Sequence, residues 1–359
     1  MTKRKIRLQT AIILPAVFFL CFSIFKYPVE CTRCVDETLK TLYNSVIPIL
    51  FPFMTISEIL TVLRMTGHIE KTVGRLFQKL YRIPQCVSGA FALGALSSYP
   101  IGAVTVTELY KDGSLTRNEA ETAAALASVT GPSFPAAVVG TLFLGNGRTG
   151  WLIYLVQLFV PLVLGVPFCR FFCKKRTGAS RIKKEKKQAD VLSVITEAVS
   201  SSSIRCVAVC GTVVIFTLFS ERLIALTGVT GTAKAIINSL FEFSGGCRNA
   251  SLLPGALGTG ICAFSVSFGG LSVIVQSAAA MKKEGLSASK LAVFKFVCGT
   301  ISGAVVSSLT YIFDIFEPSV SAVRAFSYVG GQDPFHAAAL IALFSGIILR
   351  IRYLILRSR

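Results

Sequence analysis

The sequence is poor in charged residues, in histidine and in tryptophan. Charged residues make up 15% of the 359 residues, whereas ordinary soluble domains contain about a quarter. The two histidines, His68 and His336, fall near the ends of apolar segments, with no cluster of metal ligands around them. The sequence also has no nucleophile triad and no Walker-type glycine loop. We therefore expect neither an enzyme, nor a metal site, nor a bound cofactor.

Acidic residues are scarce as well. There are 18 Asp and Glu against 37 Lys and Arg, which gives a formal net charge of +19. Nucleic-acid-binding proteins can carry such a charge, but no recognition module accompanies it here. The basic residues gather at the ends of apolar segments and in one loop, as the positive-inside rule of membrane proteins predicts. We therefore expect a lipid bilayer as a partner and no nucleic acid.

Apolar residues are abundant. They make up 53% of the chain, and the mean hydropathy is +0.66. Several runs approach the length needed to cross about 30 Å of hydrocarbon. The apolar runs lie at residues 8–25, 43–63, 87–110, 122–145, 151–172, 204–219, 252–281, 291–313 and 335–349. The expected fold class is an all-α polytopic membrane protein.

The eleven cysteines mostly occur singly within apolar runs, where a cysteine behaves as a small hydrophobic residue. Cys31 and Cys34 form a C-x-x-C pair in the first loop. A second pair, or a histidine nearby, would be needed for a zinc site. We expect these two thiols to pack against neighbouring residues, the alternative being a disulfide if the loop faces an oxidising compartment.

The distribution of charge predicts the orientation of the first half. Basic residues before the first apolar run place the N-terminus in the cytoplasm, and the charge-balanced loop at 26–40 is expected outside. Residues 65–82 carry apolar side chains at helical spacing among basic ones, which predicts an amphipathic helix in the cytoplasmic interface. The basic loop at 174–190 should also be cytoplasmic. Three full crossings before it would place it outside, so one segment must turn back.

The stretch GALSSYPIG, at Gly94–Gly102, is where we expect that turn. Pro100 interrupts a helix and disfavours helical backbone at Tyr99. Non-helical backbone inside a membrane is tolerated only where it is buried in protein or lines a polar cavity. We expect a re-entrant hairpin with a break at 97–102. A weaker counterpart, SFGGLSV, forms a break at 267–273 in the second half.

The two halves look related. TELYKDGSLTRNEAE at 107–121 aligns with AAMKKEGLSASKLAV at 279–293 when Gly113 is matched with Gly285, and SSYP then matches GGLS. We expect two pseudo-symmetric, inverted repeats, each with an interfacial amphipathic helix and a broken or re-entrant helical hairpin. If the second segment instead crosses the membrane, the halves differ in topology; symmetry favours two hairpins. The N-terminal helix with its loop, the first repeat, the basic linker, the second repeat and the basic tail occupy residues 1–40, 41–173, 174–190, 191–350 and 351–359.

Broken helices in matching positions of two halves often mark the substrate site of a transporter. The N–H groups at the start of a returning half-helix attract anions, and nearby hydroxyls add donors. The alternative is that small residues only allow the helices to pack closely. The candidate substrate-binding residues are Ser97, Ser98, Tyr99, Gly102, Thr130, Ser133, Ser267, Gly269, Gly270 and Ser272.

Three further charged residues lie in or beside apolar segments. Glu58 is a candidate for carrying a coupling proton or cation, the alternative being a position near a helix end. Glu242 precedes Gly245 and Gly246 and is a second candidate of the same kind. Lys295 lies near the start of a span, and we expect its side chain to extend to the membrane interface.

With these residues in view, the chain resembles the YlbJ family of sporulation integral membrane proteins, within the wider nucleoside-recognition or gate-domain group. The resemblance rests on LFPFMTISEIL in the second span, the S-YP-GA pattern at 98–103 and LYKDGSLTRNEAE at 109–121. The stretch from Glu242 to Gly246 and FGGLSVIVQ at 268–276 add to it. It covers most of the chain. One departure is TGPSF at 130–134, where an asparagine-containing variant is expected.

The resemblance implies a multi-pass protein of the cell membrane, located in the outer forespore membrane of a sporulating cell. Its expected function is to move a small anionic solute, dipicolinic acid, into the forespore. The wider group implies inverted repeats and helical hairpins, and its members can work as homo-oligomers. The alternatives are a transporter of a nucleoside or another organic acid, or a non-transporting scaffold for assembly of the spore envelope.

Overall fold

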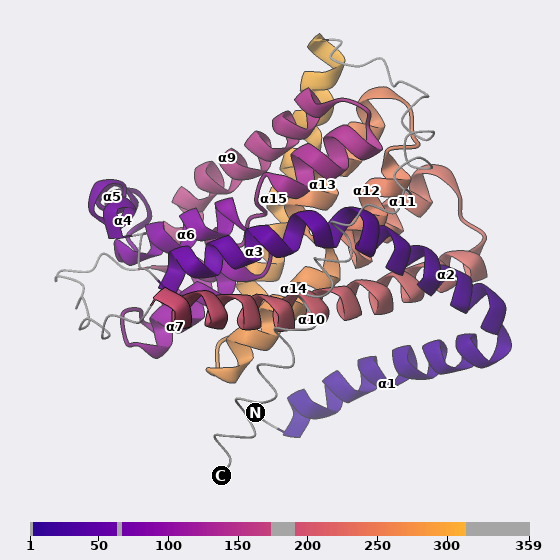
Figure 1. Ribbon diagram of the computed structural model, residues 1–359, viewed down its shortest axis with the longest axis horizontal. Helices are drawn as coiled ribbons and strands as arrows, with labels where there is room; N and C mark the ends of the chain where they lie inside the picture. Colours follow the sequence, from indigo (N-terminus) through magenta and orange to yellow (C-terminus); the bar gives the residue numbers. More distant parts are fainter. Residues whose placement is uncertain (1–2, 63–66, 174–190, 314–359) are drawn as a thin grey trace.

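The computed structural model describes residues 3–62, 67–173 and 191–313. Every regular element within these ranges is a helix. Figure 1 shows α1 at the edge of the molecule, α10 running beside α3, and α13 and α15 crossing the same bundle. The predicted all-α class is confirmed for the described part of the chain.

The N-terminal helices are sharply bent. Their bounds are α1 (Lys3–Lys26), α2 (Pro28–Thr41), the π-helical η1 (Leu42–Val46) and α3 (Ile47–Val62). The segment Pro28–Val46 is bent by 108° from Ile13–Lys26. A loop was expected at 26–40, and this expectation is wrong because helix α2 fills most of it, starting with a proline in its first turn, where a missing N–H costs nothing.

The rest of the first half consists of shorter helices followed by one long one. They are α4 (Gly67–Thr72), α5 (Gly74–Tyr81), α6 (Cys86–Leu96), α7 (Ile101–Lys111), α8 (Arg117–Ala127), the π-helical η2 (Ser133–Phe143) and α9 (Gly147–Phe172). The predicted amphipathic helix is present as the pair α4 and α5. Part of its apolar side packs inward, because Phe77 and Tyr81 are buried and the Tyr81 hydroxyl donates to the Leu162 carbonyl of α9 at 2.9 Å, whereas Val73 and Leu76 are exposed.

The second half begins with the longest described helix. Its elements are α10 (Val191–Thr227), α11 (Gly231–Phe241), α12 (Phe243–Ala250), α13 (Gly255–Phe268), α14 (Gly270–Lys283) and α15 (Ser289–Phe313). The predicted linker at 174–190, the last apolar run at 335–349 with His336, and the tail at 351–359 lie outside the described residues.

Four described segments are long and apolar enough to cross a membrane. They are Gly147–Phe172, Leu192–Thr227, Gly255–Lys283 and Ser289–Phe313, and the bent N-terminal pair is a fifth candidate. Large apolar side chains are exposed on them, as on α1, where Phe18, Phe22 and Phe25 face outward. Because such surfaces are stable in hydrocarbon and not in water, the protein is an integral multi-pass membrane protein in contact with the bilayer.

The chain turns back at the first predicted break. A Cβ atom on Gly94 of α6 would lie 3.4 Å from the Cα atom of Gly102 of α7. In a continuous helix, positions this far apart in sequence are separated by about 12 Å along the axis. Each glycine also packs against the Ala127 carbonyl at the end of α8. The hairpin between α6 and α7, with its break at Ser97–Pro100, is therefore confirmed as a reversal of the chain.

The second predicted break differs from the first. Helices α13 and α14 are interrupted only at Gly269, which has φ of +82°, and together they form one apolar segment of 29 residues without a sharp bend. The re-entrant hairpin expected here is therefore wrong for this conformation, because two left-handed glycines, Gly269 and Gly270, interrupt the helix without reversing it. The apolar run at 122–145 is also broken, between Ala127 and Ser133.

The two turns that align in sequence also have similar backbone geometry. Gly113 and Gly285 have φ of +75° and +74°, values that favour glycine. The helix before each turn ends at a lysine, Lys111 or Lys283. The turns touch, since Arg117 Nη2 donates to the Gly285 carbonyl at 2.8 Å. The internal duplication itself stays a prediction.

Candidate functional site

Two breaks of the first half pack backbone against backbone. A Cβ atom on Gly131 would lie 1.7 Å from the carbonyl oxygen of Ser97, so only a glycine allows this contact. Beside it, the hydroxyls of Ser98 and Thr130 are 3.4 Å apart. The break between α6 and α7 and the break between α8 and η2 thus form one continuous non-helical layer, buried in protein as membrane backbone requires.

Two breaks of the second half meet in the same way. A Cβ atom on Gly270 would lie 2.9 Å from the Phe241 carbonyl oxygen, and Gly270 itself has φ of +74°. Phe241 and Glu242 form the junction between α11 and α12. The glycine pair predicted from the sequence, Gly269 and Gly270, is thus required by conformation and by close packing.

Tyr99 joins the two halves. Its hydroxyl donates a hydrogen bond to the carbonyl of Val266 in α13, at 2.9 Å. Its ring contacts Phe243 of α12 edge to face, with centroids 6.1 Å apart. The two sets of breaks, which are far apart in sequence, are therefore neighbours in the structure.

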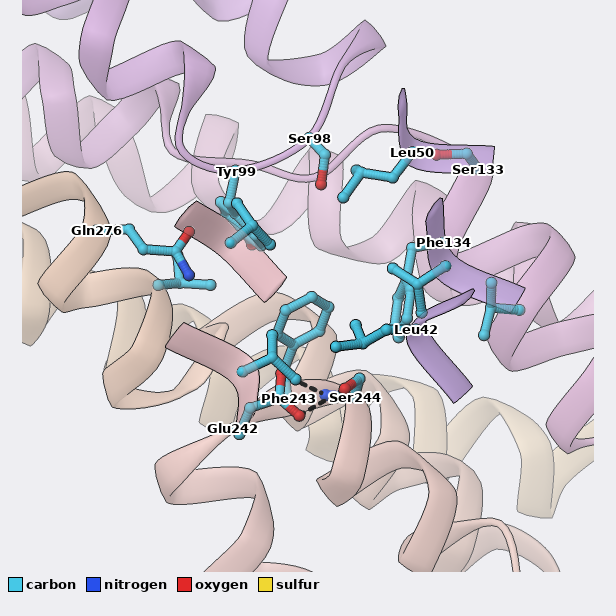
Figure 2. Close-up of a pocket in the computed structure, with 15 residues that line it drawn as sticks. Leu42, Leu50, Ser98, Tyr99, Ser133, Phe134, Glu242, Phe243, Ser244 and Gln276 are labelled. Carbon is cyan, nitrogen blue, oxygen red and sulfur yellow. Dashed lines mark hydrogen bonds between the residues drawn. The ribbon is translucent and has the colours of Figure 1, made fainter. Parts of the chain in front are cut away.

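A cavity lies between the two sets of breaks, and we call it the central cavity (Figure 2). Its polar lining comes from Ser98, Tyr99, Ser133, Glu242, Ser244 and Gln276. Its apolar lining comes from Leu42, Val46, Leu50, Phe134, Val138, Val209, Val213, Phe243 and Val273. The cavity volume is about 30 Å³, enough for about two or three water molecules. Figure 2 shows Ser98 and Tyr99 on one side of the cavity and Glu242, Phe243 and Ser244 on the opposite side.

Both π-helical segments contribute to this lining. Leu42 and Val46 come from η1, and Ser133, Phe134 and Val138 come from η2. A π-helix is wider than an α-helix, and π-helical turns are frequent at functional sites. They are a structural signal that residue types alone do not give.

Glu242 is the buried carboxylate of the cavity, with 1% of its surface exposed. Its two oxygens accept hydrogen bonds from the backbone N–H groups of Ser244 and Gly245, at 3.1 and 2.8 Å, and from the Ser244 hydroxyl at 2.5 Å. The side chain therefore caps the N-terminus of α12, where the helix dipole favours a negative charge.

Lys295 is the buried lysine beside the same breaks, with 3% of its surface exposed. The expectation that its side chain reaches the membrane interface is wrong. Its Nζ donates to the Ser128 carbonyl at 3.0 Å and to the Tyr99 hydroxyl, and it lies 4.3 Å from the centroid of the Tyr99 ring. The side chain points into the protein because Lys295 lies on the face of α15 that packs on α8 and α13.

Gln157 of α9 stabilises the break after α8 through hydrogen bonds to its backbone. It is 1% exposed, and its amide nitrogen donates to the Thr130 carbonyl at 2.8 Å. Its amide oxygen accepts from the Thr130 N–H at 3.4 Å. The N–H and the carbonyl of Thr130, which the break removes from helical bonding, are thus both satisfied by one side chain.

The predicted substrate-binding residues divide into two groups. Ser98, Tyr99 and Ser133 line the central cavity, as does the predicted coupling residue Glu242. The others form the packed layers behind it and do not line it: Ser97, Gly102, Thr130, Ser267, Gly269, Gly270 and Ser272. Among these, Ser267 accepts a hydrogen bond from Ser302 at 3.1 Å.

Glu58 lies away from the cavity lining, in an ion pair. Its two carboxylate oxygens accept from the two terminal nitrogens of Arg205, one of them at 3.1 Å. The side chains are 15% and 24% exposed. This pair joins α3 to α10, so the carboxylate predicted as a carrier of a coupling ion is occupied by an arginine.

Several cavity residues were missed from the sequence. Gln276 lies in the FGGLSVIVQ stretch, and Phe243 and Ser244 lie within the stretch from Glu242 to Gly246, but none was predicted as a site residue. Their closeness in sequence to a break could have identified them, since all three lie within a few residues of one. Lys295 and Gln157 gave a different signal: a charged and an amide side chain within long apolar runs.

No metal site is found among the described residues, where no three His, Cys, Asp or Glu side chains gather suitably. All eleven cysteines are free thiols, so the pair Cys31 and Cys34, on helix α2, forms no disulfide. Cys31 is buried, in agreement with the expectation that these thiols pack against neighbouring residues.

The sequence and the structure were compared with known proteins. No protein-family profile and no solved structure matches the chain. The chain is 21% identical over 344 residues to "Sporulation integral membrane protein YlbJ" of Bacillus subtilis (strain 168), and the match covers 84% of this chain and 83% of that protein. This chain is therefore a distant homologue of YlbJ, as the sequence resemblance predicted.

Proposed function

We propose that this protein is a secondary transporter of a small anionic metabolite, with dipicolinate as the first candidate. One observation carries the proposal: polar side chains from breaks in both halves of a membrane protein meet at a single buried cavity. Broken helices that line a cavity are how transporters bind a solute at the level of the bilayer. We propose a binding role for this lining and no catalytic one.

The lining suits a flat aromatic anion. Ser98, Ser133 and Tyr99 offer hydroxyls, and Gln276 offers an amide, as partners for carboxylate oxygens. Phe134 and Phe243 form one apolar wall, with ring centroids 4.7 Å apart. Dipicolinate has an aromatic ring with two carboxylates, so it would use both the aromatic wall and the hydrogen-bond donors.

Transport requires a change of conformation. The cavity has room for about two or three water molecules, less than a dicarboxylate needs, so the described conformation is closed. We propose that α6, α7 and η2 move relative to α12 and α13, which opens the cavity to one face of the membrane at a time. Tyr99, which connects these two groups of helices, would release Val266 during this motion.

The homology supports the cellular setting. The curated relative is named as a sporulation integral membrane protein. We propose that this chain acts in the outer forespore membrane and passes its solute towards the forespore. The similar turns at Gly113 and Gly285 support an internal duplication, which alternating access around a central site commonly uses.

The test is uptake of labelled dipicolinate into liposomes that contain the purified full-length protein, compared with empty liposomes. Saturable uptake that unlabelled dipicolinate competes for is expected. Replacement of Ser98 and Tyr99 by Ala should abolish uptake while the protein stays in the membrane. Thr212→Ala, which removes an exposed hydroxyl of α10, is the matched control and should transport normally.

The outcomes separate this proposal from its rivals. Competition by a nucleoside or another organic acid, with no effect of dipicolinate, would keep the transporter and change its solute. No uptake of any of these solutes by folded protein, under several imposed gradients, would contradict transport. Normal uptake by the Ser98 and Tyr99 variant would contradict the assignment of the cavity as the binding site.

A further inference from the structure

Lys295 is an unusual residue for its position. It lies within α15, which is a candidate membrane span, and its side chain is 3% exposed. A lysine at such a depth is costly, and those that occur face the interior of the protein and act on a solute, an ion or a fixed partner. A fixed anionic partner is the first explanation to examine.

The described partners of Lys295 are all neutral. They are the Ser128 carbonyl, the Tyr99 hydroxyl and the face of the Tyr99 ring. The Tyr99 hydroxyl donates its hydrogen bond to the Val266 carbonyl, so its oxygen accepts the hydrogen bond from the lysine. Each partner presents the negative end of a dipole, an arrangement that stabilises an ammonium group. None of the ion pairs found among the described residues involves Lys295.

The carboxylate of the central cavity does not balance this charge. Both oxygens of Glu242 are engaged by Ser244 and Gly245 at the N-terminus of α12. The positive end of that helix dipole and these donors compensate the carboxylate locally. Lys295 contacts Tyr99 on the other side of the cavity, and Tyr99 is a lining residue. The amino group of Lys295 therefore lies directly behind one wall of the cavity, without an anionic partner among the described residues.

We propose that Lys295 is the residue that makes the central cavity selective for anions. A carboxylate that enters the cavity beside Tyr99 supplies the missing negative charge, either through the Tyr99 hydroxyl or by displacing it from Nζ. A neutral solute of the same shape gains no such interaction, since the other described donors of the lining are uncharged. This inference rests on the proposed transport function and names the chemical feature of the solute that the site selects.

The experiment compares three solutes of one shape in liposomes with the full-length protein. They are dipicolinate with two carboxylates, picolinate with one, and the neutral diamide of dipicolinic acid. The wild-type protein should prefer them in that order. Lys295→Met should reduce the preference for dipicolinate over the diamide by about tenfold or more, because a buried charge acts strongly at short range. Lys295→Arg should keep most of the preference.

The controls separate selectivity from folding. Lys282→Met removes an exposed lysine of α14 and should leave the order of solutes unchanged. Thermal unfolding in detergent shows whether each variant is folded. If Lys295→Met does not fold, the wild-type order and the Lys295→Arg variant still decide the matter.

Two results would overturn the inference. One is a wild-type protein that takes up dipicolinate and the diamide equally. The other is a folded Lys295→Met variant that keeps the wild-type ratio. Both would leave the transport function standing. No uptake of any of the three solutes by the wild-type protein would instead contradict the proposed function, and this inference with it.

Discussion

The hydroxyl of Tyr99 and the carbonyl of Val266 are 2.9 Å apart, and this hydrogen bond joins the break in the first half to the helix that precedes the break in the second. The same hydroxyl accepts a hydrogen bond from Lys295. One oxygen atom thus connects the break between α6 and α7 to two helices, α13 and α15.

Tyr99→Phe should therefore destabilise the protein. It removes only the hydroxyl, but it leaves the Val266 carbonyl and one Lys295 donor without a partner, which costs about 1–3 kcal/mol. The measurement is the thermal unfolding midpoint in detergent. Tyr311→Phe is the matched control, because Tyr311 is 83% exposed, and its midpoint should equal the wild-type value. Equal midpoints for all three proteins would show that the Tyr99 hydroxyl is not part of the scaffold.

Gly131→Ala should be severely destabilising. The new methyl group would lie 1.7 Å from the Ser97 carbonyl oxygen, so one of the two breaks must move. We expect a loss of roughly 3 kcal/mol or more, at the upper end of overpacking effects. Gly211→Ala has no atom within 4 Å of the new methyl group and should be neutral or slightly stabilising. The unfolding midpoints of the two variants provide the comparison, and similar midpoints would contradict the close contact.

Glu58→Leu and Arg205→Leu should each destabilise the protein by about 2 kcal/mol, because each leaves a half-buried charge without its partner. The double variant should lose much less than the sum, since no unpaired charge remains. A double-mutant cycle on unfolding free energy measures this coupling. Additive losses would mean that the two groups act separately and would return Glu58 to consideration as a carrier of a coupling ion.

Glu121 should make stability dependent on pH. Burial alone would raise the pKa of its carboxyl, but hydrogen bonds from the Ser287 amide, Arg117 and Lys290 outweigh that effect and lower the pKa below its ordinary value of 4.5. A lowered pKa adds stability at pH values above that ordinary value, and this stability is lost as the pH falls through the folded-state pKa. These bonds join the turn at Gly113 to the turn at Gly285.

Glu121→Gln should accordingly unfold more easily than wild type at neutral pH, by about 1 kcal/mol, and the difference should shrink below pH 4.5. Unfolding midpoints measured across this pH range provide the test. Asp36→Asn is the control, because its ion pair with Lys40 is more than half exposed on both sides. A difference that stays constant with pH would show that the Glu121 charge plays no part in joining the turns.

The breaks could be predicted because they are encoded locally. Pro100 and its small neighbours interrupt a helix wherever they occur, and Gly269 with Gly270 permits a left-handed backbone. Glu242 could be found in the same way, since an acidic residue directly before a helix start suits its N-terminus. For these positions, residue type and immediate neighbours were sufficient.

The remaining features depend on packing between distant segments. Arg205 lies 147 positions from Glu58, and no pattern in one sequence pairs them. Lys295 was placed at the interface because a lysine near the start of a span usually reaches water. Which face of α15 packs inward is decided by α8 and α13, which the helical period alone does not reveal. The second hairpin was expected from symmetry, but the glycine pair at the break did not reverse the chain.

The narrowness of the central cavity determines how the bilayer is sealed. Space for about two or three water molecules, walled by residues such as Leu42, Val46 and Phe134, is too small for a continuous water-filled pore. In this conformation the described helices therefore leave no continuous aqueous path through the central cavity. If the protein is the secondary transporter that we propose, such a closed state preserves the electrochemical gradients on which it would draw. Its turnover rate would then be limited by helix movement and not by diffusion through an open channel.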